Sequence, residues 1–265
     1  MNLPARAASL ALLIAASGCR GHQAGKGLPP VPSAPPSPPA PAGPVRLHGR
    51  ILFQGEPPPS MPRSVPYDQD VCGGEARVDH SLEVDPTTGG VRWAVITLSR
   101  LTAPPAGEAL PDTARVDQAR CDYLPYLTLV RPGARITFTN ADPILHAVRA
   151  IDSAGHSRVL SLPPGSSGEV ILDGEDRWKL VCDLHPWSQA WVITSRAEFA
   201  AVSDEKGEYS FHEVPPGRWR LDVWEERLVE ASREVEVPAE GAAVLDLTLA
   251  PRPVSAPGKA PPPPT

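Results

Sequence analysis

The sequence contains no apolar run long enough to cross a membrane, and aromatic residues make up only 5% of its 265 residues. A spanning helix needs about 20 consecutive apolar residues, so an integral helical membrane protein is excluded. Basic residues are also in the minority, because 25 Lys and Arg stand against 31 Asp and Glu, for a formal net charge of −6. Nucleic-acid-binding domains usually carry basic patches, so nucleic acid is not expected as a partner.

Proline is abundant but unevenly distributed. Of the 35 prolines, nine lie in residues 28–44 and seven in residues 251–265. Such tracts form extended polyproline segments and cannot build a packed core. We therefore predict a disordered Pro-rich linker over 19–44 and a Pro-rich tail over 251–265. Residues 45–250 remain, which is enough for one large or two small domains.

The amino terminus has the features of an export signal over residues 1–18. Arg6 precedes an apolar run over 7–16, and small residues follow. The tetrapeptide ending at Cys19 (Ala-Ser-Gly-Cys) resembles the bacterial lipobox, although it lacks the usual leucine. This resemblance implies an acylated Cys19, a membrane anchor, and residence in the bacterial cell envelope. Arg20, in place of Asp, favours a periplasm-facing outer-membrane location. The alternative is an ordinary cleaved signal followed by an incidental cysteine.

Short runs of alternating or β-branched residues fill the region from 45 to 250, with no long stretch at helical spacing. Turn signals such as Pro132-Gly133 and Asp173-Gly174 separate the runs. This pattern predicts an all-β protein built from sandwiches. The predicted strands are 46–53, 91–99, 126–130, 135–139, 146–151, 158–162, 168–172, 178–182, 190–194, 208–213, 218–223, 232–237 and 243–249.

The last part of this region, 196–250, resembles the second half of the carboxypeptidase regulatory-like (transthyretin-like) β-sandwich. The matching residues are Asp204, Gly207, Tyr209, Phe211, Pro215, Pro216, Gly217 and Leu221. Strands like those of the first half occur much earlier, within 45–116, in "LHGRILFQGEPP" and "WAVITLSRL". We therefore expect a second domain, about 117–195, to be inserted into this small sandwich. Two domains in tandem are the alternative, with the early strands belonging to the second domain.

Two segments carry residues suited to metal chemistry: "RPGARITFTNADPILHAVRA" and "WKLVCDLHPWSQAWV". Together they resemble the cupredoxins, and most closely the plastocyanin-like proteins of the methylamine-utilisation type. The resemblance implies a Greek-key sandwich over 117–195 with His146, Cys182 and His185 as metal ligands. A thiolate and two imidazoles suit a copper ion that changes oxidation state with little rearrangement. One copper ion, electron transfer or copper handling, and a redox protein partner are therefore expected.

The axial position of such a site departs from the family pattern. Ser188 stands where the relatives carry a methionine, and the only methionines of this chain are Met1 and Met61. The Gln189 amide or the Leu145 carbonyl could serve as a weak axial partner. Alternatively, the site has decayed and no longer binds metal.

The remaining cysteines can be assigned once Cys19 is taken as lipidated and Cys182 as a ligand. Cys72 and Cys121 are left in an oxidising setting that permits disulfides, so a bond between them is expected; two buried free thiols are the alternative. No nucleophile elbow, phosphate loop or paired-carboxylate motif is present, so we do not expect an enzyme. A metal-free β-sandwich lipoprotein that binds carbohydrate or an envelope protein is the competing function.

Overall fold

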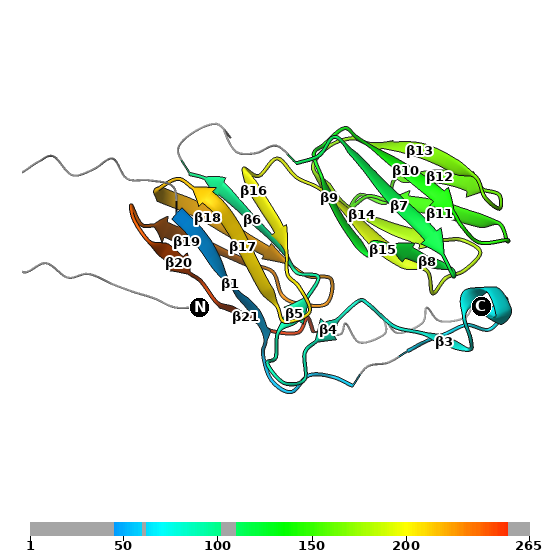
Figure 1. Cartoon of the computed structure of the whole chain (residues 1–265), viewed down its shortest axis with the longest axis horizontal. Coiled ribbons are helices and arrows are strands. Elements are labelled where there is room, and N and C mark those ends of the chain that lie inside the picture. The colour runs from blue at the N-terminus through cyan, green and yellow to red at the C-terminus, as the bar shows by residue number, and fades with distance from the viewer. Residues whose placement is uncertain (1–44, 60–61, 102–109, 254–265) are drawn as a thin grey trace, which may run out of the picture. The chain divides into compact units, whose positions relative to one another are not determined.

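A computed structural model describes residues 45–59, 62–101 and 110–253 (Figure 1). The predicted signal segment, Cys19, the linker and most of the Pro-rich tail lie outside the described residues. Within the described part the protein is all-β, and its one helix is the four-residue α1 (Gln69–Cys72). Of the residues described, none forms a helix with the length and apolarity needed to span a bilayer.

One pair of sheets joins strands from the beginning and the end of the described chain. β1 (Val45–Phe53) lies between β17 (Glu208–Val214) and β20 (Ala242–Val244), and it also pairs with β21 (Leu247–Leu249). The second sheet has the order β16 (Phe199–Val202), β6 (Val95–Arg100), β18 (Gly217–Trp224) and β19 (Ala231–Val237). Strands from 45–100 therefore pair with strands from 199–249 (Figure 1).

Alternating side chains of β1 explain why this strand is central to its sheet. Val45, Leu47 and Ile51 are buried, whereas the residues between them are more exposed. Gly49 belongs to the same inward series, and a Cβ atom there would lie 1.9 Å from the Leu245 carbonyl oxygen. Glycine is therefore required where the two backbones approach most closely.

The residues between these strands form a second pair of sheets. The first has the order β13 (Ser167–Leu172), β10 (Ala134–Asn140), β7 (Thr113–Ala119) and β8 (Asp122–Leu124). The second has the order β12 (Ser157–Leu162), β11 (His146–Ile151), β14 (Asp176–Cys182), β15 (Gln189–Thr194) and β9 (Leu127–Val130). A core that includes Phe138, Ile136 and Leu180 lies among them.

A short segment, residues 63–77, lies outside both pairs of sheets, and we call it the strap. It contains β2 (Arg63–Ser64), α1 and β3 (Ala76–Arg77), with β2 paired to β3. A disulfide joins Cys72 of α1 to Cys121 in the turn between β7 and β8. β4 (Glu83–Val84) and β5 (Val91–Arg92) form a further small hairpin.

Several strand boundaries differ from those predicted. The strand predicted over 91–99 is interrupted at Trp93, whose φ of 66° is incompatible with an extended backbone. The strand predicted over 243–249 is divided into β20 and β21. The two-residue strands β2, β3 and β4 and the longer β7, β8 and β16 have no counterpart among the predicted strands. In β7 the reason is composition, because its inward series contains only one large apolar residue, Val116, beside the polar Gln118.

Candidate metal centre

Neighbouring strands bring the three predicted ligands together. His146 begins β11, Cys182 ends β14, and His185 follows in the loop before β15. β11 and β14 are antiparallel, with Val148 opposite Cys182. The turn before His146 is held by Asn140, whose side-chain amide donates to the carbonyls of Ile144 at 2.7 Å and Leu162 at 2.8 Å. The ligand segments are therefore fixed by backbone pairing and by a buried amide.

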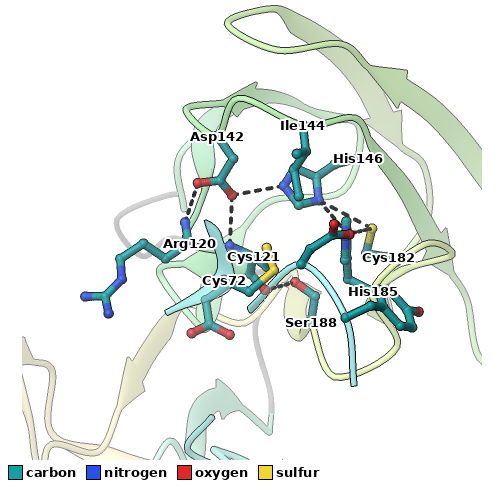
Figure 2. Close-up of a disulfide and its surroundings, with 12 residues drawn as sticks. Cys72, Arg120, Cys121, Asp142, Ile144, His146, Cys182, His185 and Ser188 are labelled. Carbon is teal, nitrogen blue, oxygen red and sulfur yellow. Dashed lines mark hydrogen bonds and ion pairs between the residues drawn. A yellow bond between two sulfur atoms is a disulfide. The ribbon is translucent and has the colours of Figure 1, made fainter. Parts of the chain in front are cut away.

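The three ligand atoms form a compact triangle. The Cys182 Sγ atom lies 3.7 Å from His146 Nδ1 and 3.5 Å from His185 Nδ1, and the two nitrogens are 3.0 Å apart. A triangle with these sides has a centre about 2.0 Å from each corner, close to the ~2.0–2.3 Å range of metal–nitrogen and metal–sulfur bonds. All three side chains are almost completely buried. The arrangement can thus hold one ion with little movement (Figure 2).

Each histidine presents Nδ1 to this centre and Nε2 to a carboxylate. His146 Nε2 is 2.9 Å from Asp142 Oδ2, and His185 Nε2 is 3.2 Å from Asp68 Oδ2. Asp142 also accepts hydrogen bonds from the backbone N–H groups of Arg120 and Cys121 (Figure 2). Burial lowers the pKa of His146, although its hydrogen bond with Asp142 acts in the opposite direction. A neutral imidazole is the form that binds metal.

Aromatic residues cover the outer side of His185. The ring of Tyr67 lies 6.0 Å from that of His185 and 5.1 Å from that of Trp187, measured between centroids. The Tyr67 hydroxyl donates to the Leu184 carbonyl at 2.6 Å. His185 is only 2% exposed as a result.

Two buried polar side chains, Ser188 and Gln118, lie together near the disulfide. Ser188 is fully buried and donates to the Cys121 carbonyl. Gln118 is 1% exposed; its amide nitrogen lies 3.4 Å from the Ser188 hydroxyl, and its Oε1 has no hydrogen-bond partner in the part of the chain described. Of the two predicted axial candidates, Gln189 donates through its side-chain amide to the Pro186 carbonyl at 3.0 Å, and Leu145 is 44% exposed as a residue. Gln118 and Ser188 therefore form a buried polar pair next to the loop that carries His185.

The disulfide lies beside the same site. Sulfur atoms of Cys72 and Cys121 are within 4.8 Å of a His185 nitrogen, and both residues are fully buried. Because these sulfurs are joined to one another, Cys182 is the free thiol of the described residues. The cysteine available as a thiolate ligand is therefore the predicted one.

Two residues of the site were missed in the sequence. Asp68 precedes His185 by 117 residues, and no spacing rule connects them. Gln118 lies in a strand that the sequence pattern did not predict. Asp142 was part of the motif that predicted the site, but its bond to His146 becomes visible only in the fold.

Comparisons with known proteins found similarity only at the level of structure. No family model matches the sequence, and no curated protein matches it either. A purple cupredoxin from Nitrosopumilus maritimus is 26% identical, with a TM-score of 0.28, over 31% of this chain and 99% of its own. A copper-containing nitrite reductase from Thermus scotoductus is 18% identical, with a TM-score of 0.30, over 37% of this chain and 25% of its own. A variant of amicyanin is 16% identical, with a TM-score of 0.29, over 37% of this chain and 99% of its own.

Proposed function

We propose that this protein binds one copper ion through His146, Cys182 and His185 and transfers single electrons. The observation that carries the proposal is the buried triangle of one sulfur and two nitrogen atoms around a point at bonding distance from all three. Copper bound there would alternate between its cuprous and cupric states and so accept or release one electron.

The donor set favours copper over other common metals. Structural zinc sites usually have four protein ligands, whereas no fourth His, Cys or carboxylate joins this triangle among the described residues. Two imidazoles and one thiolate with a weak axial partner are the ligand set of electron-transfer copper. Gln118, through its unpartnered Oε1, joins Gln189 and Leu145 as a candidate for that partner.

The surrounding protein keeps the ligands in place in both oxidation states. β11 and β14 hold His146 and Cys182 in one antiparallel pair, and the Asp183 N–H donates to the Ala147 carbonyl at 2.9 Å beside them. Because the three side chains are buried, water is kept from the ligand atoms. A site that needs little rearrangement is suited to moving an electron and not to transforming a substrate. We therefore propose an electron carrier or copper-handling protein and not an enzyme.

We place this carrier in the bacterial cell envelope. The apolar run before Cys19 supports export, and acylation of Cys19 would anchor the chain at a periplasm-facing outer membrane. The disulfide supports an oxidising compartment. A second redox protein is the partner that this function requires.

Copper loading tests the proposal directly. The purified protein, incubated with one equivalent of cupric ion, should retain it and show strong thiolate-to-copper absorption in the visible range. Cys182→Ser should abolish that band and leave the fold intact, because serine is nearly isosteric with cysteine. His146→Gln should lower copper retention by removing one ligand. His156→Gln is its matched control, since the His156 side chain is 75% exposed and lies in the turn between β11 and β12, at the end of β11 opposite His146.

Two results would contradict the copper function. Stoichiometric copper without a thiolate band would place the ion elsewhere and exclude this electron-transfer site. Failure of the wild type to retain copper would favour the metal-free alternative, a β-sandwich lipoprotein that binds carbohydrate or an envelope protein.

A further inference from the structure

The Nε2 atom of His185 lies against a carboxylate from another part of the chain. We call the two sheets of residues 113–194, which hold the three candidate ligands, the ligand sandwich, and this carboxylate comes from outside it. Asp68 Oδ2 lies 3.2 Å from His185 Nε2, and 117 residues separate the two in sequence. The Asp68 side chain is 46% exposed, whereas that of His185 is 3% exposed. The contact between Asp68 and His185 therefore lies at the boundary between the buried site and solvent. Asp68 itself belongs to the strap.

The strap holds Asp68 from both sides. One residue earlier, Tyr67 is hydrogen-bonded to the Leu184 carbonyl and packs against Trp187. Four residues later, Cys72 is tied by its disulfide to Cys121, and the Cys72 N–H donates to the Asp68 carbonyl at 2.8 Å. Asp68 itself has a φ of 51°, a left-handed conformation that aspartate tolerates better than most residues.

Besides the disulfide, an ion pair attaches the strap to β8. The guanidinium of Arg77 in β3 forms an ion pair with Asp122 at the start of β8, next to Cys121. The disulfide and this ion pair thus attach the strap to the β7–β8 turn. The same turn supplies the backbone N–H groups that hold Asp142 (Figure 2).

We propose that Asp68 is a positioning residue for the metal ligand His185, delivered to it by the disulfide-tethered strap. This inference rests on the copper function proposed above. By accepting the Nε2–H of His185, Asp68 fixes the tautomer whose Nδ1 lone pair points at Cys182 and His146. Its negative charge also stabilises the cupric state more than the cuprous state, and so lowers the reduction potential.

The two histidines differ in how their carboxylates are held. Asp142 is 6% exposed and has three partners within the ligand sandwich itself. Asp68 depends on a segment that the sandwich does not contain. A movement of the strap could therefore change the hydrogen bond of His185 while the ligand sandwich itself stays unchanged.

Substitution at Asp68, with Asp70 as control, tests this role. Asp70 is exposed, lies in α1 two residues after Asp68 and carries the same charge, and no hydrogen bond or ion pair of the described residues joins it to His185. Asp68→Asn retains an acceptor but loses the charge, so the reduction potential should rise relative to Asp70→Asn. Asp68→Ala removes the acceptor as well, and it should weaken copper binding by about 10–100-fold, the usual cost of losing such a partner.

A spectroscopic readout separates positioning from general stability. In the diamagnetic cuprous protein, the Nε2–H proton of His185 should give a slowly exchanging NMR signal in the wild type and in Asp68→Asn. That signal should exchange rapidly in Asp68→Ala. Equal potentials for Asp68→Asn and Asp70→Asn, together with an unchanged proton signal in Asp68→Ala, would overturn the proposal.

The tether is tested by a double-mutant cycle. Replacing Cys72 and Cys121 together by alanine should loosen the strap without leaving a free thiol beside the site, so Asp68→Asn should change the potential less in that background than in the wild type. A full effect of Asp68→Asn without the disulfide would show that the tether does not deliver the carboxylate. A wild type that lacks the thiolate band would defeat the copper function itself, whereas a wild type with the band and indifferent Asp68 variants would defeat only this inference.

Discussion

Removal of the disulfide between Cys72 and Cys121 should destabilise the fold by several kcal/mol. The two cysteines are 49 residues apart in sequence. In the chain-entropy model, cross-linking residues this far apart removes enough freedom from the unfolded chain to contribute about 4 kcal/mol. Domains commonly have total stabilities of only about 5–15 kcal/mol, so the loss should be easy to measure.

Two effects of packing around the bond act on this estimate in opposite directions. Both cysteines are fully buried in a small cluster with Val65 and Trp187. Alanine at either position leaves a gap where a sulfur atom was, and the neighbouring strap loses its covalent tie. The strap retains the Arg77–Asp122 ion pair and the Tyr67 hydrogen bond, which limits the damage. The expected cost therefore stays near the loop-entropy value.

Urea unfolding of the two single variants and the double variant provides the measurement. Cys72→Ala and Cys121→Ala should each lower the free energy of unfolding by about 4 kcal/mol, and the double variant should lose no more than either single variant. Reduced wild type serves as the control and should match them. A loss below about 1 kcal/mol, or losses that add in the double variant, would refute the reasoning, and so would free thiols at both positions in exported protein.

Three further results are expected. Ser188→Met should strengthen axial ligation and lower the reduction potential measured by voltammetry; an unchanged potential would show that the thioether does not reach the ion. Burial raises the pKa of Glu225 to about 7, so the folded protein loses stability relative to the unfolded chain as pH rises from about 4.5 through 7. Glu225→Gln should therefore stabilise the protein by up to about 3 kcal/mol at pH 8 and little at pH 4, with the exposed Glu234→Gln as control; equal gains at both pH values would contradict this. Cys19→Ala should release the protein from the membrane fraction or leave its signal uncleaved, whereas wild type found wholly soluble after cell breakage would exclude the anchor.

The three residues of the candidate metal centre could be predicted from sequence because they lie in local motifs that resemble those of the cupredoxins. Cys182 and His185 are three residues apart in one loop, and His146 follows a recognisable strand and turn. Most strands were also predicted, because their side chains alternate between buried and exposed, as in β11 and β14. Local motifs thus indicated the candidate ligands, and local periodicity indicated the all-β class.

The partners of the ligands depend on distant parts of the chain, and periodicity contains no information about them. Asp68 lies beside His185 in a strap that a disulfide, an ion pair and a tyrosine hydrogen bond join to the site. Gln118 occupies an inward position of β7 that a pattern of apolar residues does not mark. Trp93 has a backbone conformation that its residue type does not favour. Each of these features results from tertiary contacts that override local preference.

The pairing of β1 with β17 has a consequence for how the chain folds. Arg50 and Glu208, which face each other in this pair, are 158 residues apart. Closing so long a loop costs entropy before any contact compensates for it, and folding slows as contacts become more distant in sequence. The strands between 113 and 194 pair only among themselves and close shorter loops. The two sheets of residues 113–194, which include His146 and Cys182, can therefore form early. Once folded, they hold the two ends of this segment at fixed positions, which shortens the search that β1 and β17 must complete.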